Sequence, residues 1–306
     1  MQASRFEAHQ IPVAASDRRA IGPSGIKQPK INRRDNGLRN SLLLSILCLF
    51  FRSLIGQECL ANDAIEGLLA ATFRLTDGEH SGTGFLVTDP SVTNPESKTN
   101  EVILVTAKHV FEQMNGTKCD LILRTKIGED EFVRLSVTID IRDGDQRLWL
   151  QHPDVDVATL KIDLPKNASA KPIPFERLAD ESKLKDRTVR VGQETWIACF
   201  PAKLEANEAG WPVLRKGTIA SYPLKPARTT KTFLVDYNVF GGDSGAPVAV
   251  IVDEKILLVG VASSMHRQTD RTTLPFEERV VHFPLGVSIV VHAEFLRETI
   301  CFKKEE

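Results

Sequence analysis

From Ala64 onward, short apolar or alternating runs are separated by turn residues, and almost no stretch keeps a helical period for ten residues. Alternation with a period of two is typical of β-strands, whose successive side chains point to opposite faces. Many short strands with Gly and Pro turns favour barrels or a sandwich, and the periodicity alone leaves both open. The predicted strands are Leu68–Leu75, Gly84–Thr88, Val102–Thr106, Leu121–Thr125, Phe132–Ile141, Val155–Ile162, Thr188–Val191, Thr195–Cys199, Val213–Ser221, Thr232–Val235, Ala246–Val252, Ile256–Ala262 and Val280–Val291.

One polar, proline-rich break divides this β pattern into two halves. Leu164–Pro174 contains three prolines, and the charged stretch Glu176–Arg187 follows it. Such a composition suits a linker between two β units. We therefore expect a first β unit over residues 62–165, a linker over 166–187, and a second β unit over 188–306. A single closing helix is expected at His292–Cys301, near the end of the second unit.

The first 61 residues differ in composition from the rest of the chain. Met1–Asn40 holds eight Lys and Arg against three Asp and Glu, and the apolar run Leu42–Phe51 follows, closed by Arg52. A positive head, a short apolar run and a cleavage site near Ala61 are typical of a signal peptide. The run is shorter than the roughly 20 apolar residues that span a bilayer, so export to the periplasm or the extracellular space is expected, with a membrane anchor as the alternative. The head is longer than usual, which leaves the translation start open.

The overall composition is ordinary for a soluble globular protein and gives no sign of a nucleic-acid partner. Net charge is −1, with 42% hydrophobic and 26% charged residues, so nothing global indicates a nucleic-acid partner. After cleavage near Ala61, three cysteines remain at wide spacing, namely Cys119, Cys199 and Cys301. This odd number without a CxxC pair predicts neither a disulfide scaffold nor a structural metal site.

The most informative short segment is Phe240–Pro247, which reads FGGDSGAP and leads into an apolar strand. A nucleophilic serine needs an exposed turn with converging backbone N–H groups, and flanking glycines permit such a turn. Ser244 is therefore the candidate nucleophile. The amides of Gly242 and Ser244 are the candidate donors to an oxyanion.

A serine nucleophile requires a base within hydrogen-bond reach, and that base requires a partner of its own. His109 ends an apolar strand and is the candidate base. Asp156 precedes another apolar strand and is the candidate partner of the histidine. Asp154 lies two residues earlier on the same side of the chain, and we prefer Asp156 because small apolar residues follow it.

These segments resemble the trypsin/chymotrypsin superfamily of serine proteases, particularly compact bacterial Deg/HtrA-like members. Thr106–His109 resembles the TAxH box, Asp156–Leu160 the D-[IV]-A-x-L box and Gly242–Gly245 the GDSG box, in the order His, Asp, Ser. Ser81–Val87 is similar to an early strand of that family, and Arg215–Ser221 to a strand of its second barrel. The resemblance covers residues 64–300.

The resemblance implies two antiparallel β-barrels with the active site between them. It also implies a serine endopeptidase that acts on polypeptides without a metal or an organic cofactor. Asn238, six residues before Ser244, would lie at the base of the pocket for the residue before the cleaved bond, which favours an apolar or neutral side chain there. Ser263 and Ser264 would lie on the strand that pairs with extended substrate. Asp243 is expected to be a buried structural carboxylate.

Two features depart from better-known members of the superfamily. No Ile-Val-Gly-Gly-like activation start is visible, and the sequence ends at Glu306, so we expect no PDZ domain. The alternative function is an inactive or latent protease homologue that serves as a binding or scaffold module. The physiological substrate and the oligomeric state are left open by the sequence.

Overall fold

The computed structural model describes residues 63–91 and 101–302. The basic head, the apolar run, Cys48, Cys59 and the expected cleavage site near Ala61 lie outside the described residues. Within the described part, no helix has the length and apolar character needed to cross a membrane.

The first half of the described chain is a seven-stranded antiparallel sheet with the order β5-β4-β1-β2-β3-β9-β8. A small ribbon of β6 and β7 lies in the chain between the outer strands β5 and β8. The sheet wraps around an apolar core to which Leu86, Leu121 and Leu160 contribute. The strands are β1 (Thr72–Thr76), β2 (Ser81–Thr88), β3 (Glu101–Thr106), β4 (Lys118–Lys126), β5 (Phe132–Asp140), β6 (Arg142–Asp143), β7 (Gln146–Arg147), β8 (Leu150–Gln151) and β9 (Ala158–Asp163).

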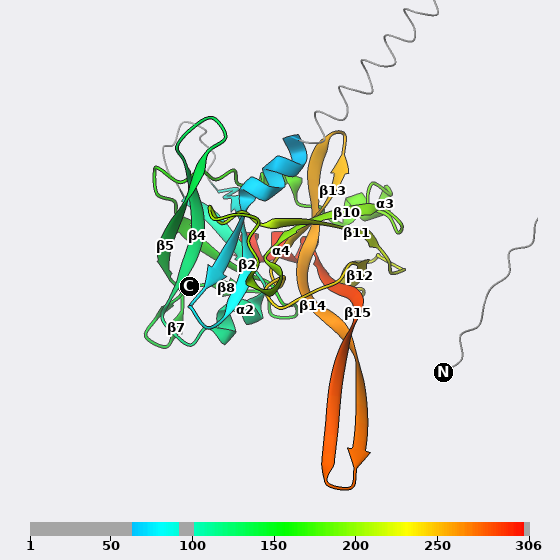
Figure 1. The fold of residues 1–306 in the computed structure, drawn as a ribbon. Helices are drawn as coiled ribbons and strands as arrows, with labels where there is room; N and C mark the ends of the chain where they lie inside the picture. The colour runs from blue at the N-terminus through cyan, green and yellow to red at the C-terminus, as the bar shows by residue number, and fades with distance from the viewer. Residues whose placement is uncertain (1–62, 92–100, 303–306) are drawn as a thin grey trace, which may run out of the picture. The chain divides into compact units, whose positions relative to one another are not determined.

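The second half is a closed barrel with the strand order β10-β11-β12-β15-β14-β13 (Figure 1). Its interior is filled by alternating side chains of these strands, among them Ile197, Val235 and Val250. The strands are β10 (Glu194–Cys199), β11 (Val213–Ile219), β12 (Thr232–Asp236), β13 (Pro247–Val252), β14 (Lys255–Leu274) and β15 (Glu277–His292). The all-β fold expected from the sequence is therefore confirmed.

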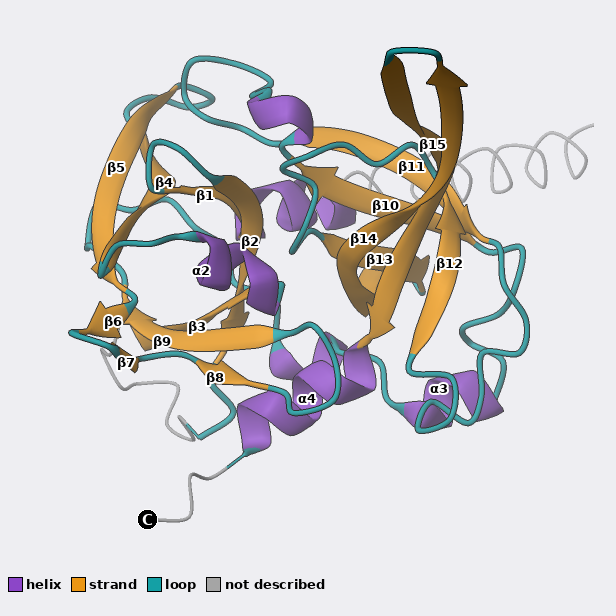
Figure 2. Cartoon of the chain, turned by 90° about the horizontal axis from the view of Figure 1, so that it is seen from below, coloured by secondary structure: helices purple, strands orange, loops and turns teal. Residues whose placement is uncertain are grey.

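Short helices connect and cover the two β units (Figure 2). The C-terminal helix α4 (Ala293–Cys301) confirms the expected closing helix, and its Phe295 and Leu296 are buried. They pack in an apolar cluster that also holds Val157 of the first unit and Val261 of the second. Each such buried side chain contributes roughly 1.5–3 kcal/mol, so this shared core holds the two units together. The other helices are residues 63–71, α2 (Lys108–Gln113), η1 (Phe175–Arg177), α3 (Glu181–Lys185) and η2 (Pro201–Lys203).

The structure corrects three of the expected elements. Residues 68–71 are helical, because Ile65, Leu68 and Leu69 follow helical spacing in a stretch rich in alanine. Residues 188–191 form no strand, and Gly192 turns the chain there with φ +80°. The strand expected at Ile256–Ala262 continues to Leu274, where both faces are exposed and no apolar alternation marks the strand.

Candidate active site

A cleft between the two β units brings the predicted site residues together. It is lined by His109 of the first unit and by Gly242, Ser244 and Ser263 of the second. These residues come from three separate parts of the chain, so the cleft exists only because the two units pack on each other. The lining residues lie in a turn and near the ends of strands, as expected for site residues that a rigid scaffold positions.

His109 is positioned by the strand that precedes it. β3 lies between β2 and β9 in the sheet, and His109 is the second residue of α2, directly after that strand. Thr106 at the end of β3 pairs with Ala158 at the start of β9. This register places residue 156, just before β9, beside residue 109, just after β3.

Asp156 holds the histidine through two hydrogen bonds. Its Oδ2 lies 2.6 Å from His109 Nδ1, and its Oδ1 accepts the backbone N–H of His109 at 3.0 Å. Asp154 instead pairs with Lys231, with 3.1 Å between Oδ2 and Nζ. Of the two carboxylates considered from the sequence, Asp156 is thus the one in contact with His109. The contact leaves Nε2 as the ring nitrogen available for proton transfer.

A third hydrogen bond to Asp156 comes from the second β unit. The hydroxyl of Ser263 donates to Asp156 Oδ2 at 2.6 Å. Burial raises the pKa of Asp156. The hydrogen bond and charge of His109, the Ser263 hydroxyl and the His109 amide together lower the pKa by more than burial raises it. The net pKa lies below the ordinary value, which keeps this carboxylate ionised. The sequence assigned Ser263 to substrate binding only, and nothing in its local pattern signals this contact.

Ser244 lies in a tight turn that is tied to both units. Its carbonyl accepts the amide of Thr83 at 2.9 Å, and the amide of Gly245 donates to Ala262 at 2.7 Å. The hydroxyl of Ser244 donates to the carbonyl of Ser263 at 3.0 Å. Among the described residues it makes no hydrogen bond to His109, so a rotation of this hydroxyl must precede proton transfer to the ring.

Gly242 adopts a conformation that only glycine tolerates well. Its φ is +100°, and a Cβ there would lie 2.3 Å from the Phe200 carbonyl. The Gly241 carbonyl accepts the Ala202 amide at 2.7 Å, and in a trans peptide the adjoining N–H of Gly242 points the opposite way. In the described part of the chain, neither this N–H nor that of Ser244 donates to a protein acceptor. Both remain available to an incoming oxyanion.

Asp243 is fully buried beneath this turn, as expected for a structural carboxylate. Its Oδ2 accepts the Phe240 amide at 2.9 Å and lies 3.3 Å from Arg215 Nη1. Burial raises the pKa of Asp243, although the Phe240 amide, the Cys199 thiol and the charge of Arg215 each lower it in part. The sequence marked residues 215–221 as a strand of the second barrel and did not identify Arg215 as the cation beside this carboxylate.

Two of the three predicted substrate-binding residues line the cleft, and Asn238 does not. Ser263 and Ser264 line it directly. Asn238 is exposed, and its Oδ1 lies close to Gly286 of β15, where an added Cβ would be 3.0 Å away. The next residue, Val239, is part of the cleft lining.

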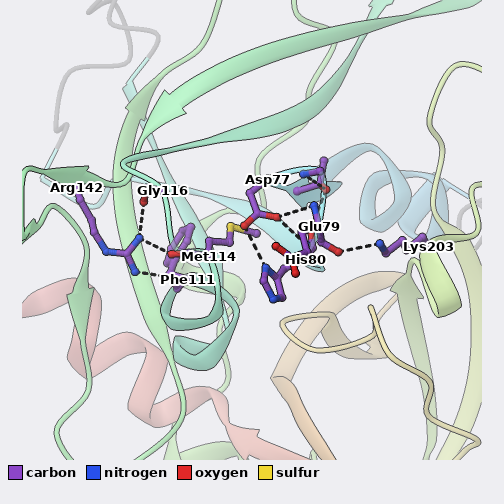
Figure 3. A network of polar contacts seen from close by, with 10 residues as sticks. Asp77, Glu79, His80, Phe111, Met114, Gly116, Arg142 and Lys203 are labelled. Atoms are coloured by element: carbon purple, nitrogen blue, oxygen red, sulfur yellow. Dashed lines mark hydrogen bonds and ion pairs between the residues drawn. The ribbon is translucent and has the colours of Figure 1, made fainter.

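His80, Ser81 and Lys203 also line the cleft, and Figure 3 shows Lys203 reaching the turn between β1 and β2. Lys203 Nζ donates to the Glu79 carbonyl at 2.9 Å, and His80 Nδ1 lies 3.1 Å from Asp77 Oδ2. Arg142 secures the far end of α2 by donating to the carbonyls of Phe111, Met114 and Gly116. The Arg142 contacts therefore fix the C-terminal end of α2, the helix that carries His109.

The charges around the cleft are predominantly positive. Lys203 and Arg267 line it together with two histidines, and among the described lining residues none is Asp or Glu. In the same described part of the chain, no group of three His, Cys, Asp or Glu side chains is arranged to hold a metal ion.

Comparison with known proteins identifies the family. No curated protein sequence matches the chain. A solved structure of Rv3671c from M. tuberculosis H37Rv, described as an inactive serine-to-alanine mutant, is similar at 14% identity with a TM-score of 0.41. The similarity covers 78% of this chain and 88% of that one. Residues 82–261, more than half of the chain, match the family model of the trypsin-like peptidase domain. The chain therefore belongs to the family of trypsin-like peptidase domains and is a protein of the protease type.

Proposed function

We propose that this protein is a serine endopeptidase that hydrolyses peptide bonds through an acyl-enzyme. The observation that carries the proposal is the 2.6 Å contact between His109 Nδ1 and Asp156 Oδ2 in the cleft that also holds Ser244. A histidine oriented in this way presents its other nitrogen as a general base. The family to which the chain belongs supports the same reaction class.

Acylation begins when the Ser244 hydroxyl turns from the Ser263 carbonyl toward His109 Nε2. Ser244 Oγ forms a bond to the peptide carbonyl carbon while its proton passes to Nε2. The carbonyl oxygen takes the negative charge, and the amides of Gly242 and Ser244 stabilise it. One such donor commonly contributes about 10²–10³ in kcat.

The tetrahedral species then collapses in the direction of the products. His109 gives its proton to the leaving nitrogen, the C–N bond breaks, and the acyl group stays on Ser244. A water molecule next loses a proton to His109 and attacks the ester carbon. The proton returns to Ser244 Oγ as the acid leaves, so each group ends in its starting state. The ionised Asp156 stabilises the imidazolium in both halves of the cycle.

The alternative is a latent or inactive homologue that binds a partner through the same cleft. The Ser244 hydroxyl donates to Ser263 in place of His109, which is the observation that favours this reading. Catalytic hydrogen bonds of unliganded enzymes often tighten only when substrate arrives, so this geometry is compatible with activity. Hydrolysis must therefore be measured directly.

The test is incubation of the purified full chain with a reduced and alkylated, unfolded protein, followed by mass spectrometry of the fragments. We expect new internal cleavages with wild type and none above background with Ser244→Ala. Ser136→Ala, in an exposed position on β5, is the matched control and should cleave like wild type. A correctly folded wild type that yields no fragments would favour the binding module. The fragment ends would also test the expected apolar or neutral residue before the cleaved bond.

We further propose that residues 1–61 direct export to the periplasm or the extracellular space. The support is the basic head followed by a short apolar run. N-terminal sequencing of protein secreted by an expressing cell would test this, with a new N-terminus near Ala61 expected. An uncleaved chain that fractionates with membranes would favour the anchor.

A further inference from the structure

Two cationic side chains line the cleft, and they approach the nucleophile from different elements. The Ser244 hydroxyl donates to the Ser263 carbonyl of β14, and the Ser244 carbonyl accepts the Thr83 amide of β2. Arg267 lines the cleft from β14, whereas Lys203 lines it from the end of η2, beside the turn that precedes β2. Among the described residues, no ion pair includes either cation. Both are therefore available to a substrate, at different ends of the cleft.

Lys203 is held in its place by contacts to both β units. Its Nζ donates to the Glu79 carbonyl at 2.9 Å, in the turn before β2 (Figure 3). Its backbone lies against the oxyanion turn, because a Cβ added at Gly242 would be 3.5 Å from the Lys203 nitrogen. The Ala202 amide donates to the Gly241 carbonyl at 2.7 Å and fixes the same arrangement. An ammonium group has three donors, so Lys203 can bind a ligand while it keeps the contact to Glu79.

The backbone that carries this lysine is strained. Ala202 has a φ of +49° and Lys203 a φ of +67°, in the left-handed region that glycine enters without steric cost. Side chains held in this region cost free energy, and such residues cluster at functional sites. A glycine at position 203 would relieve the cost but would remove the ammonium group from the cleft. The strain therefore points to a function for the Lys203 side chain.

A histidine lies next to this ammonium group. His80 directly follows Glu79 and lines the same cleft (Figure 3). Its Nδ1 is 3.1 Å from Asp77 Oδ2, while Asp77 Oδ1 accepts the backbone amides of Glu79 and His80. The Asp77 carboxylate is thus occupied within its own turn, and its side chain is only 14% exposed. Within the described part of the chain, Nε2 of His80 has no hydrogen-bond partner, so it is available beside Lys203.

We propose that Lys203, with His80 beside it, binds an acidic side chain in the part of the substrate that follows the cleaved bond. The proposal rests on the proposed function, because it requires a peptide carbonyl at Ser244. The family resemblance assigns the segment before that bond to Ser263 and Ser264, so the segment after it continues toward η2 and β2. A carboxylate is the fitting ligand, because a lysine and a histidine line this part of the cleft and no described acidic side chain does. An extended chain advances about 3.3 Å per residue, so the acidic side chain is expected within about the first three residues after the bond.

The first experiment maps the bonds that the full chain cleaves in a reduced and alkylated, unfolded protein. Asp and Glu should be enriched about two- to fivefold after the cleaved bonds of wild type, which is the range for an exposed ion pair. Lys203→Met should remove this enrichment, and Lys203→Arg should keep it. Lys203→Glu should replace it by an enrichment of Lys and Arg. Lys166→Met, at an exposed lysine outside the cleft, is the matched control and should cleave like wild type.

The second experiment measures binding without turnover, in the full chain with Ser244→Ala. Two fluorescein-labelled octapeptides of alternating Ala and Ser are compared by fluorescence polarisation, one with a central Glu and the other with a central Gln. The Glu peptide should bind about two- to fivefold more tightly at low salt. The difference should disappear when Lys203→Met is added, and it should shrink in 0.5 M NaCl because exposed charges are screened. Adding Arg267→Met in place of Lys203→Met should preserve the difference.

The possible outcomes separate this proposal from its rivals and from the proposed function. Equal affinity of the two peptides for the chain with an intact Lys203 would overturn it. A difference that is lost with Arg267→Met and kept with Lys203→Met would move the acidic preference to β14 and would also overturn it. Fragments without acidic enrichment would contradict the role of Lys203 and leave the proposed function intact. No fragments at all, together with binding of the Glu peptide that depends on Lys203, would contradict the proposed function and support the carboxylate site.

Discussion

Arg215 Nη1 lies 3.3 Å from Asp243 Oδ2, which places a cation of the same chain against the carboxylate that directly precedes the nucleophile. The Arg215 guanidinium also lies over the rings of Tyr237 and Phe240, at 5.3 and 5.5 Å from their centroids. Because the Phe240 amide donates to the same carboxylate oxygen, the pair links β11 to the turn that carries Ser244. Arg215 is therefore the cationic partner of the buried Asp243 carboxylate.

Arg215→Met should destabilise the protein, because it leaves a fully buried carboxylate without its cation. We expect the free energy of unfolding in urea to fall by about 3–5 kcal/mol. Adding Asp243→Asn to this variant should recover most of the loss, since the uncompensated charge is removed. If the two substitutions are additive, the ion pair does not stabilise the turn.

Ser263→Ala should slow catalysis because Asp156, the carboxylate that orients His109, loses a hydrogen bond. The substitution removes the 2.6 Å hydrogen bond to Asp156, and a hydrogen bond to a charged group contributes about 1.5–3 kcal/mol. We expect kcat/KM to fall roughly tenfold or more. Ser136→Ala, at an exposed serine of β5 outside the cleft, is the matched control, and it should change kcat/KM little. Equal losses in the two variants would contradict this role of Ser263.

The stability of the protein should decrease at mildly acidic pH because of His292. Burial lowers the pKa of His292 to about 4, although the Thr230 backbone and Glu181 raise it slightly. The unfolded chain binds a proton at this histidine near pH 6.5, before the folded protein does, so stability is lost as the pH falls from about 6.5 to 4. Over this range the free energy of unfolding should fall by about 3 kcal/mol in total. Urea unfolding of His292→Phe, whose ring can still pack on Phe233, should show a flatter pH dependence. An unchanged pH dependence would exclude His292 as the cause.

Arg124 should be essential for joining the loop before β11 to the first sheet. Its guanidinium is fully buried between the rings of Phe73 and Trp211, where burial lowers its pKa to about 9. It donates to the carbonyls of Leu69, Thr72 and Gly210.

Arg124→Met leaves these buried carbonyls unpaired, and we expect a loss of at least about 3 kcal/mol in the free energy of unfolding. Arg134→Met is the comparison, because Arg134 reaches the same loop through Glu205 but is more exposed. That variant should lose less than about 1 kcal/mol. Similar losses in both variants would show that burial of Arg124 is not the decisive difference.

Local patterns in the sequence predict much of the site, because the site residues end regular strands. His109 follows β3, and Asp156 precedes β9, so the alternation that marks the two strands also locates the two side chains. The pairing of β3 with β9 brings His109 and Asp156 together. This pairing could be predicted from the sequence only through the family resemblance.

Contacts between distant segments could not be predicted in this way. Arg215 and Asp243 are 28 residues apart, and Ser263 and Asp156 are 107 apart, with no spacing rule that connects them. The outer part of β14 was missed for another reason. Its two faces are both exposed, so the apolar alternation on which strand prediction depends is absent.

The most direct test of the central claim is labelling of the purified full chain with a fluorophosphonate probe, which reacts only with an activated serine. Wild type should be labelled at Ser244, and Ser244→Ala should remain unlabelled. His109→Ala should lose labelling too, since the base that activates Ser244 is gone. A folded wild type without label, or label that persists in Ser244→Ala, would contradict the assignment of Ser244 as the nucleophile.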